Sequence, residues 1–210
     1  MSQLIHYRRM ELRDIEAVLD LLWIIFEDME LPLLHQYPYA LLKQLILQGM
    51  HDSTFRYSPA RGIVAIQEEQ VVGVIFVYPG KEQPSIDDAL NRLLQEYLQP
   101  GLVMFEDLET SEETYYIDAL VVHPVAQKQG IAKNLIHQAK QKAKDEGYNR
   151  LDLNCDVEND KAKHLYESLG FNVRKQRNIS SHLYDEMTYL FGEVKEETGE
   201  RSHYPQNPSL

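Results

Sequence analysis

The stretch that decides the fold runs from Tyr115 to Ala132 and reads Tyr-Tyr-Ile-Asp-Ala-Leu-Val-Val-His-Pro-Val-Ala-Gln-Lys-Gln-Gly-Ile-Ala. Its first part, 115–122, is rich in β-branched and aromatic residues, which is typical of a strand. Pro124 marks a turn, and a short polar loop with one glycine follows. Apolar residues then recur at helical spacing. We therefore expect a strand, a loop and a helix start in immediate succession.

The loop and the helix start at Gly130 form a candidate anion site. A helix N-terminus presents unpaired backbone N–H groups and a partial positive charge. Gly130 has no side chain, so a phosphate can approach the backbone closely, and Lys128 and Lys133 add positive charge. The pattern favours a pyrophosphate site, although an ordinary strand–helix turn with solvated lysines has the same local sequence. The Walker pattern and the three-glycine dinucleotide fingerprint are absent from the sequence, so nucleotide hydrolysis is not supported.

Composition indicates an ordinary soluble globular protein. The chain has 210 residues, of which 43% are hydrophobic and 26% charged, enough for one domain with appendages. Its single cysteine, Cys155, allows no intrachain disulfide, so we expect a reducing, cytoplasmic setting. We see no secretory signal, and the apolar run Leu21 to Phe26 is too short to span a membrane, which takes about 20 residues.

The charge is negative and unevenly distributed. A formal net charge of -12 argues against general nucleic-acid binding, because that needs a basic surface. Residues 81–114 hold nine acidic and two basic residues, whereas 123–144 hold five lysines and no acid. The acids would suit a cationic small substrate, and solubility explains them equally well.

Working outward from the opening stretch, the periodicity predicts the remaining elements. Downstream we expect the helix to end near Asp145, followed by a strand over 150–155, a helix over 159–169 and two antiparallel strands, 171–177 and 183–191. Upstream we expect a strand over 4–10, a helix from 13 broken by Pro32, a second helix after Pro38 ended by Gly49, and a hairpin of 62–67 with 71–78. Residues 81–114 are predicted to be an insertion with a helix over 86–99 and a short strand over 102–105. Residues 193–210 are polar and are predicted to be a tail.

This order predicts an α/β (α+β) fold over residues 3–192. The unit from Tyr115 to Cys155 is β-α-β, which requires parallel strands joined by a right-handed crossover. The other strands are linked as hairpins and should be antiparallel. We therefore expect a mixed, mostly antiparallel sheet with helices on both faces.

Two motifs resemble those of the GCN5-related N-acetyltransferase (GNAT) family. Gln127-Lys128-Gln129-Gly130-Ile131-Ala132 matches the signature Gln/Arg-x-x-Gly-x-Gly/Ala, with alanine in place of the more frequent glycine. Asn159 to Phe171 matches Asn-x-x-Ala-x-x-Leu-Tyr-x-x-x-Gly-Phe. Residues 120–124 look like the end of the family's fourth strand. The resemblance covers 3–192 and leaves out only the insertion and the tail.

The resemblance implies an acyl-CoA-dependent N-acyltransferase that moves acetyl from acetyl-CoA to a primary amine by direct attack in a ternary complex. It implies no metal and a small amine as the other partner. Tyr166 would be the general acid near the thioester sulfur. The implied cofactor-binding residues are, along the pantetheine arm, Leu120, Val121 and Val122; around the pyrophosphate, Gln127, Lys128, Gln129, Gly130, Ile131 and Ala132; and further along the cofactor, Asn159 and Ala162.

Asp118 is the candidate general base, because a base must remove the proton of the acceptor ammonium. It interrupts an apolar strand just before the cofactor segment, where partial desolvation would strengthen a carboxylate base. Strand alternation predicts that it shares a side with Tyr116, Leu120 and Val122. A structural ion pair is the alternative role. Other candidates for the base are Glu106, Asp107 and Glu109.

Several alternatives stay open at this point. Tyr166 could be a core tyrosine of an amphipathic helix, and Cys155 is better explained as a small core residue than as a nucleophile. The insertion could be a lid, a dimer contact or a wall of the substrate site, so a homodimer stays open as well. The chain could also bind acyl-CoA as a sensor or scaffold without turnover.

Overall fold

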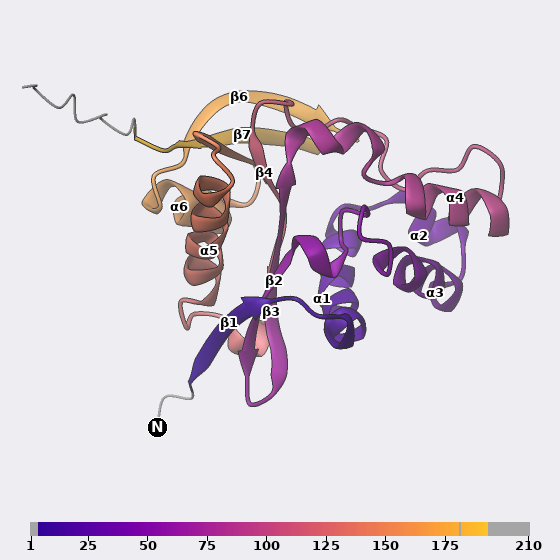
Figure 1. The fold of residues 1–210 in the computed structure, drawn as a ribbon. Coiled ribbons are helices and arrows are strands. Elements are labelled where there is room, and N and C mark those ends of the chain that lie inside the picture. The colour runs from indigo at the N-terminus through magenta and orange to yellow at the C-terminus, as the bar shows by residue number, and fades with distance from the viewer. Residues whose placement is uncertain (1–3, 181, 193–210) are drawn as a thin grey trace, which may run out of the picture.

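A seven-stranded sheet organises the part of the chain that the computed structural model describes, residues 4–180 and 182–192. The strand order is β1-β2-β3-β4-β5-β7-β6 (Figure 1). The strands are β1 (Ile5–Arg9), β2 (Gly62–Gln67), β3 (Gln70–Pro79), β4 (Tyr115–Val122), β5 (Arg150–Asp156), β6 (Asn172–Ile179) and β7 (His182–Leu190). Only β4 and β5 pair in parallel, while the other neighbours are antiparallel. The mixed, mostly antiparallel sheet with a central β-α-β unit is confirmed.

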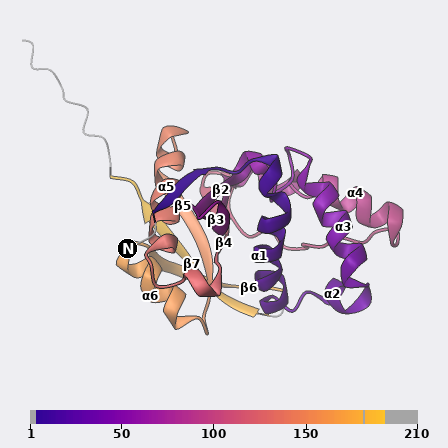
Figure 2. The same ribbon diagram turned by 90° about the horizontal axis from the view of Figure 1, so that it is seen from below.

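Helices cover both faces of the sheet, as expected (Figures 1 and 2). They are α1 (Ile15–Asp28), α2 (Pro32–Gln36), α3 (Tyr39–Met50), α4 (Asp88–Tyr97), α5 (Ile131–Asp145) and α6 (Asp160–Ser168). Helix α1 packs on β3 and β4 from one side, and α5 packs on β2, β3 and β4 from the other. Two apolar cores result, one with α1 and α3 and one with α5. The predicted tail lies outside the described residues.

A β-bulge in β4 corrects one expectation about Asp118. Opposite β3, Phe76 faces Ala119 and Val77 faces Ile117, so Asp118 is the extra residue. A bulge breaks the alternation of side chains along a strand. Leu120 and Val122 therefore pack toward the α5 core, whereas the carboxylate of Asp118 contacts Arg56 and Tyr78 instead. Asp118 does not share the side of Leu120 and Val122.

Strands β4 and β5 separate soon after they meet. Their pairing covers only Tyr115–Ile117 of β4 against Leu151–Leu153 of β5. Strand β5 continues to Asp156 beside β7, and β4 continues to Val122 beside β3. Consequently the facing edges of β4 and β5 lie open beyond this short seam.

Two local predictions were wrong in detail, and one was incomplete. Helix α1 ends before Pro32, as expected, but Pro32 also begins the short helix α2, because its fixed φ suits the first turn of a helix. Helix α3 continues past Gly49, which lies buried against Leu90 of α4. Residues 102–105 form no strand, and Phe105 instead packs its ring on Phe26 and Tyr57.

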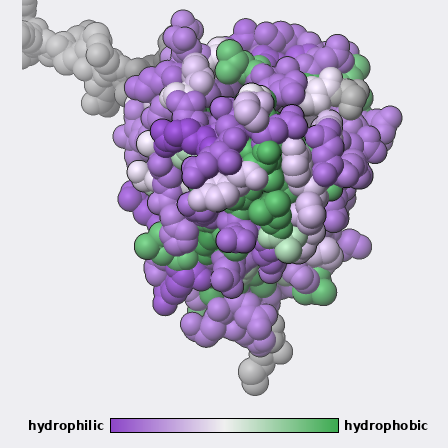
Figure 3. Space-filling model, turned by 90° about the vertical axis from the view of Figure 1, so that its right-hand side faces the viewer, coloured by the Kyte–Doolittle hydropathy of each residue, from purple (hydrophilic) through white to green (hydrophobic). Residues whose placement is uncertain are grey.

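The segment 81–114 is well ordered and partly helical. A 3-10 turn, Gly80–Ser85, precedes α4, which packs against α3. Figure 3 looks at the side of the molecule that carries α2, α3 and α4, where hydrophobic side chains gather in a central strip within a hydrophilic surface. No helix in the described part of the chain is long and apolar enough to cross a membrane.

Candidate active site

Two cavities of about 370 Å³ each meet where β4 and β5 separate. One lies between β4, α5 and α6, and we call it the lysine-side cavity. The other lies between β4, α1 and the start of β7, and we call it the acid-side cavity. The cavities share the lining residues Leu120, Val122, Gln127, Asn159, Ala162 and Tyr166. A continuous passage therefore crosses the sheet at the gap between the strands.

The lysine-side cavity gathers most of the predicted cofactor residues. Nine of the predicted eleven line it, namely Leu120, Val122, Gln127, Lys128, Gly130, Ile131, Ala132, Asn159 and Ala162. Val121 lines the acid-side cavity instead. Gln129 lines neither, and its side chain accepts a hydrogen bond from Gln67 at 3.5 Å. Lysines 128, 133 and 161 line the lysine-side cavity, and no acid does so among the described residues.

The loop before α5 has the geometry of an anion cradle. Lys128 (φ 63°) and Gly130 (φ 79°) both adopt the left-handed conformation, which alternates with extended backbone at Gln127. Gly130 caps α5, and a Cβ built on it would meet no atom within 4 Å. Gly130, Ile131 and Ala132 all line the lysine-side cavity, so this cavity borders the first turn of α5, where backbone N–H groups lack partners within the helix.

Gln127 connects the loop to both neighbouring elements. Its Nε2 donates to the carbonyl oxygen of Val122 at 3.3 Å, and its Oε1 accepts from Nζ of Lys161 on α6 at 3.0 Å. On α6, the Asn159 side chain caps the helix by accepting from the N–H of Ala162 at 3.0 Å. These contacts hold the loop, the end of β4 and the start of α6 around one cavity.

The open edge of β4 presents backbone groups to the gap. His123 donates its N–H to Val72 of β3 at 2.9 Å. Backbone groups point to alternate sides along a strand, so those of Val122 and Leu120 point away from β3. They face the space that β5 leaves when it diverges, where an extended ligand can pair with them as an added strand.

Tyr166 stands at the junction of the two cavities. It lies on α6, lines both cavities and packs edge-on against Phe171 with ring centroids 6.0 Å apart. Burial, and then the nearby thiol of Cys155, raise the pKa of the Tyr166 phenol. The hydroxyl is therefore protonated at neutral pH and can donate a hydrogen bond or a proton.

Cys155 is a buried residue of the core, 3% exposed, that also lines the acid-side cavity. Burial raises the pKa of its thiol to about 11. The thiolate is the nucleophilic form of cysteine, so this side chain is a poor nucleophile at neutral pH.

A buried ionic cluster surrounds Asp118. Arg56, from the loop between α3 and β2, is 2% exposed and binds Asp87 through Nε (2.8 Å) and Nη2 (2.7 Å). Its Nη1 donates to Oε1 of Glu109 at 3.1 Å and to Oδ1 of Asp118 at 3.0 Å. Tyr78 donates its hydroxyl to the same Oδ1 at 2.7 Å, whereas Oδ2 of Asp118 has no hydrogen-bond partner.

Three carboxylates share one guanidinium in this cluster, so negative charge is in excess. Burial raises the pKa of Asp87 and of Glu109, and Arg56 offsets this only in part. Burial lowers the pKa of Arg56, but the attraction of Asp118 and the other anions outweighs it, so the net shift is upward. Glu109 also accepts a hydrogen bond from the hydroxyl of Tyr116 at 2.8 Å.

The cluster joins the predicted insertion to β4. Asp87 and Glu109 come from 81–114, and Glu109 lines the acid-side cavity. Two of the other proposed bases, Glu106 and Asp107, line neither cavity, and Asp107 accepts from the N–H of Ser180 at 2.7 Å. Arg56 could not be singled out from the sequence, because an isolated arginine in a loop resembles a solvated one.

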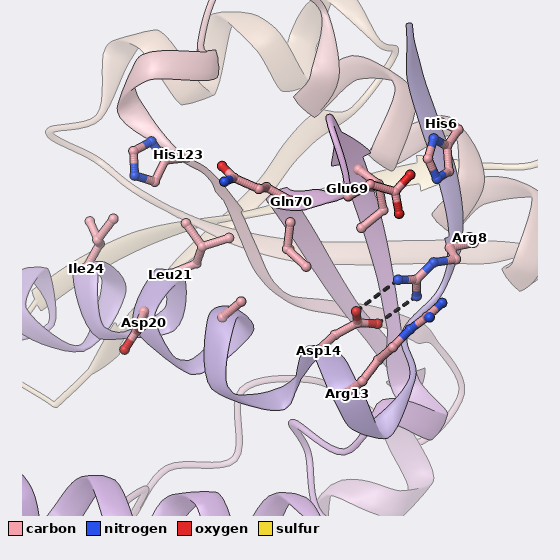
Figure 4. A pocket seen from close by; sticks show the side chains of 13 residues that line it. His6, Arg8, Arg13, Asp14, Asp20, Leu21, Ile24, Glu69, Gln70 and His123 are labelled. Carbon is pink, nitrogen blue, oxygen red and sulfur yellow. Dashed lines mark hydrogen bonds and ion pairs between the residues drawn. The ribbon is translucent and has the colours of Figure 1, made fainter.

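A third cavity, of about 590 Å³, lies between β1, the β2–β3 turn and α1 (Figure 4). Its charged groups are largely satisfied by protein partners. Arg8 binds Asp14 through two hydrogen bonds of 2.6 and 2.9 Å, and Asp20 pairs with Lys43. Ile24, which also lines the acid-side cavity, and His123, at the end of β4, connect it to the candidate site. Within the described part of the chain, no residue of 125–132 lines this third cavity, so we assign it no role in the site.

The fold and the divided sheet define the class of the protein as an acetyltransferase. The chain belongs to the acetyltransferase (GNAT) family, whose family model matches residues 15–171. Among curated proteins, none matches the chain in sequence. In the described residues, no group of three or more His, Cys, Asp or Glu side chains is placed to hold a metal ion.

Solved structures agree with this assignment. A crystal structure of an acetyltransferase is similar with a TM-score of 0.80 and 29% identity, over 89% of this chain and 100% of that chain. An N-acetyltransferase from Staphylococcus aureus Mu50 has a TM-score of 0.77 and 23% identity, over 88% and 100%. The PaiA N-acetyltransferase from Thermoplasma acidophilum, solved with coenzyme A, has a TM-score of 0.55 and 14% identity, over 90% and 99%. The last two show the fold alone.

Proposed function

We propose that the protein transfers acetyl from acetyl-CoA to a primary amine, by direct attack of the amine within a ternary complex. One observation carries the proposal: two cavities of opposite charge meet at the gap between β4 and β5, with Tyr166 at the junction. A phosphate-bearing substrate fits the lysine side, and an amine fits the acid side.

The residues present fit the groups of CoA. The N–H groups of 127–132 and the three lysines would hold the pyrophosphate, and the open edge of β4 at Leu120 and Val122 would pair with the pantetheine arm. Asn159 and Ala162 would line its path along α6. Bound there, acetyl-CoA supplies an activated acyl group as a thioester.

Asp118 would take the proton of the incoming ammonium. An alkylammonium has a pKa near 10, so little free amine exists at neutral pH and a base is needed. The Oδ2 atom of Asp118 is free to accept, while Arg56 and Tyr78 hold Oδ1. Glu109 is the alternative base, since burial raises its pKa and so strengthens it as a base, but both of its oxygens already accept hydrogen bonds.

The Val122 N–H and the Tyr166 hydroxyl would stabilise the negative charges that develop during the transfer. The N–H of Val122 faces the gap, where it can stabilise negative charge that develops on the attacked carbonyl oxygen. The C–N bond forms as the C–S bond breaks, and Tyr166 would protonate or hydrogen-bond the departing thiolate. Its raised pKa keeps the phenol protonated, which makes it a hydrogen-bond donor to the thiolate but a weak acid.

Cofactor binding and turnover can be tested separately. Acetyl-CoA should raise the melting temperature of the protein, because a ligand that binds only the folded state stabilises it. Tyr166→Phe should lower kcat by about a hundredfold and leave the Kd of acetyl-CoA within about twofold. Tyr148→Phe is the matched control, since Tyr148 packs on Tyr115 and lines neither cavity. Equal turnover of the two variants would remove Tyr166 from the mechanism.

The base can be assigned by a second pair of variants. Asp118→Asn should abolish the rise of kcat/KM with pH that reports the base, whereas Glu109→Gln should shift the profile without abolishing it. The reverse result would assign the base to Glu109. If acetyl-CoA stabilises the protein and a broad panel of amines releases no CoA, the chain is a sensor or scaffold instead.

A further inference from the structure

The acid-side cavity carries an excess of negative charge along its whole length. Four carboxylates line it, from Asp28, Glu109, Asp118 and Asp156, and no lysine, arginine or histidine does so in the described part of the chain. We propose that the acceptor is a small aliphatic amine with at least two positive charges, a diamine or polyamine. This inference rests on the proposed function and specifies its second substrate.

Two buried acceptor atoms that face the inner end of the cavity have no hydrogen-bond partner within the described structure. The side chain of Asp118 is 1% exposed, and its Oδ2 has no partner. Asn154 lines the same cavity, and its Oδ1 is also buried without a partner. The orientation of this amide is set by its nitrogen, which donates to the Tyr116 hydroxyl and to the backbone carbonyl of Glu109. Buried acceptors without donors are costly, and an ammonium group supplies three donors and a positive charge.

Arg56 cannot neutralise the inner end of the cavity, since its one positive charge is already shared among three carboxylates. Its Nε and Nη2 are used by Asp87, and its Nη1 is divided between Glu109 and Asp118. Tyr78 and Tyr57, whose hydroxyls both interact with Asp118, carry no charge. The inner end therefore fits the reacting ammonium of the acceptor.

The outer end of the cavity can hold a second cation. Asp28, at the end of α1, is exposed, and its side chain makes no hydrogen bond or ion pair among the described residues. The Asp156 side chain is 30% exposed; its Oδ2 lies 3.6 Å from Nδ1 of His182, and its Oδ1 accepts a hydrogen bond from the N–H of Glu158 at 2.8 Å. Both carboxylates lie outside the buried cluster of Asp118, and no lysine or arginine of the described chain forms a salt bridge with either of them.

The wall between the two ends is apolar. Ile24, Ile25 and Met29 of the α1 side and Ile179 of β6 line it. Methylene groups between two ammonium groups would pack against these side chains. A volume of about 370 Å³ suits a small acceptor rather than a folded protein segment.

The experiment compares two acceptors that differ only in the second charge, 1,4-diaminobutane and 4-amino-1-butanol. With acetyl-CoA saturating, the diamine should have the higher kcat/KM by about tenfold, from two partly exposed ion pairs of about two- to fivefold each. In the complex with CoA, which cannot transfer, the diamine should raise the melting temperature more than the amino alcohol does. Equal values for the two compounds in both measurements would overturn the inference.

Neighbouring residues on α1 provide a matched pair of variants. Asp28→Asn should reduce the diamine-to-amino-alcohol preference by about two- to fivefold, mainly through KM of the diamine. Glu27→Gln removes a charge from the adjacent exposed residue, which does not line the cavity, and should leave the preference unchanged. The same loss in both variants would show a general charge effect and would contradict specific recognition at Asp28.

Failure of the proposed function would look different. In that case no amine would release CoA, yet the diamine would still stabilise the CoA complex more than the amino alcohol. If N-terminal peptides release CoA and both small amines do not, the inference is wrong while the acetyltransferase activity stands.

Discussion

Replacement of Arg56 by methionine tests the buried cluster that connects the insertion to β4. Methionine has a similar length and keeps the contact with the ring of Phe105, which lies 4.1 Å from the guanidinium carbon. It removes four charge-assisted hydrogen bonds, to Asp87, Glu109 and Asp118. Three buried carboxylates then face one another without a counter-charge.

The expected cost is large for a single substitution. Removing one partner of a buried ion pair costs about 3 to 5 kcal/mol, because the other charge stays buried and unpaired. For a domain of this size that lowers Tm by roughly 10 °C. With a urea m-value of about 2 to 3 kcal/mol/M, the unfolding midpoint falls by about 1.5 M.

The loss of stability in Arg56→Met should depend on pH, and the pKa values of the carboxyl groups determine whether it grows or shrinks. The pKa values of Asp87 and Glu109 in the folded protein are already raised by burial, and loss of Arg56 raises them further. When the pKa of a carboxyl group is higher in the folded state than in the unfolded state, its protonation stabilises the folded protein. This contribution is fully present at pH values below the unfolded-state pKa and is lost as the pH rises through the folded-state pKa. The variant should therefore be closer to the wild type at pH 5 than at pH 8.

Urea unfolding of the wild type and three variants at pH 5 and pH 8 completes the test. Arg92→Met is the matched control, because Arg92 is 73% exposed and lies 3.8 Å from its partner Asp52, so we expect at most about 0.5 kcal/mol. Arg56→Lys keeps the charge, should fold if Arg56→Met does not, and should show an intermediate loss. A loss below about 1 kcal/mol for Arg56→Met, or a loss that shrinks with rising pH, would refute the reasoning.

Three further predictions concern single residues. Gly130→Val should reduce the free energy of unfolding by about 1 to 2 kcal/mol, because φ is 79° there. Calorimetry should show that it weakens acetyl-CoA binding at least as much as Gly130→Ala does. Unchanged binding would exclude this backbone from the site. Cys155 should resist iodoacetamide at pH 8 and react in urea, since it is 3% exposed and burial raises its pKa to about 11; rapid labelling of the folded protein, seen by mass spectrometry, would contradict this. Burial raises the pKa of Asp14, but hydrogen bonds from Arg8 outweigh this effect and hold the pKa below its usual value. Asp14→Asn should therefore reduce the free energy of unfolding by about 1 to 2 kcal/mol at pH 7. The reduction should be smaller as the pH falls toward 3, because the wild type then loses the same ion pair. A constant deficit in urea midpoints would argue against the pair.

The elements around the loop could be predicted from sequence because their determinants are local. The helical spacing of apolar residues from Ile131 onward, and the Pro124 turn, each depend on residues a few positions apart. The positive φ of Gly130 likewise follows from one residue type at the helix start. Seven of the nine predicted cofactor residues that line one cavity come from the continuous stretch 120–132, whereas Asn159 and Ala162 of α6 were identified by the family resemblance.

Features set by distant parts of the chain could not be predicted. The bulge at Asp118 exists because β3 and β4 change register, which depends on both strands. Arg56 is 31 residues from Asp87 and 62 from Asp118, so its role appears only when three elements meet. The wrong strand at 102–105 has the same origin, since Phe105 is drawn into the aromatic core beside Phe26 and Tyr57.

The short seam between β4 and β5 has a consequence for motion. Three residue pairs join a four-stranded half of the sheet to a three-stranded half, and the apolar core around α5 spans both halves. Beyond this seam the facing strand edges have no backbone partners in each other, so we expect local opening there rather than separation of the halves. Amide hydrogens at Leu120 and Val122 should exchange quickly in the free protein. A ligand lying along both edges would slow that exchange, so that the substrate itself would complete the sheet.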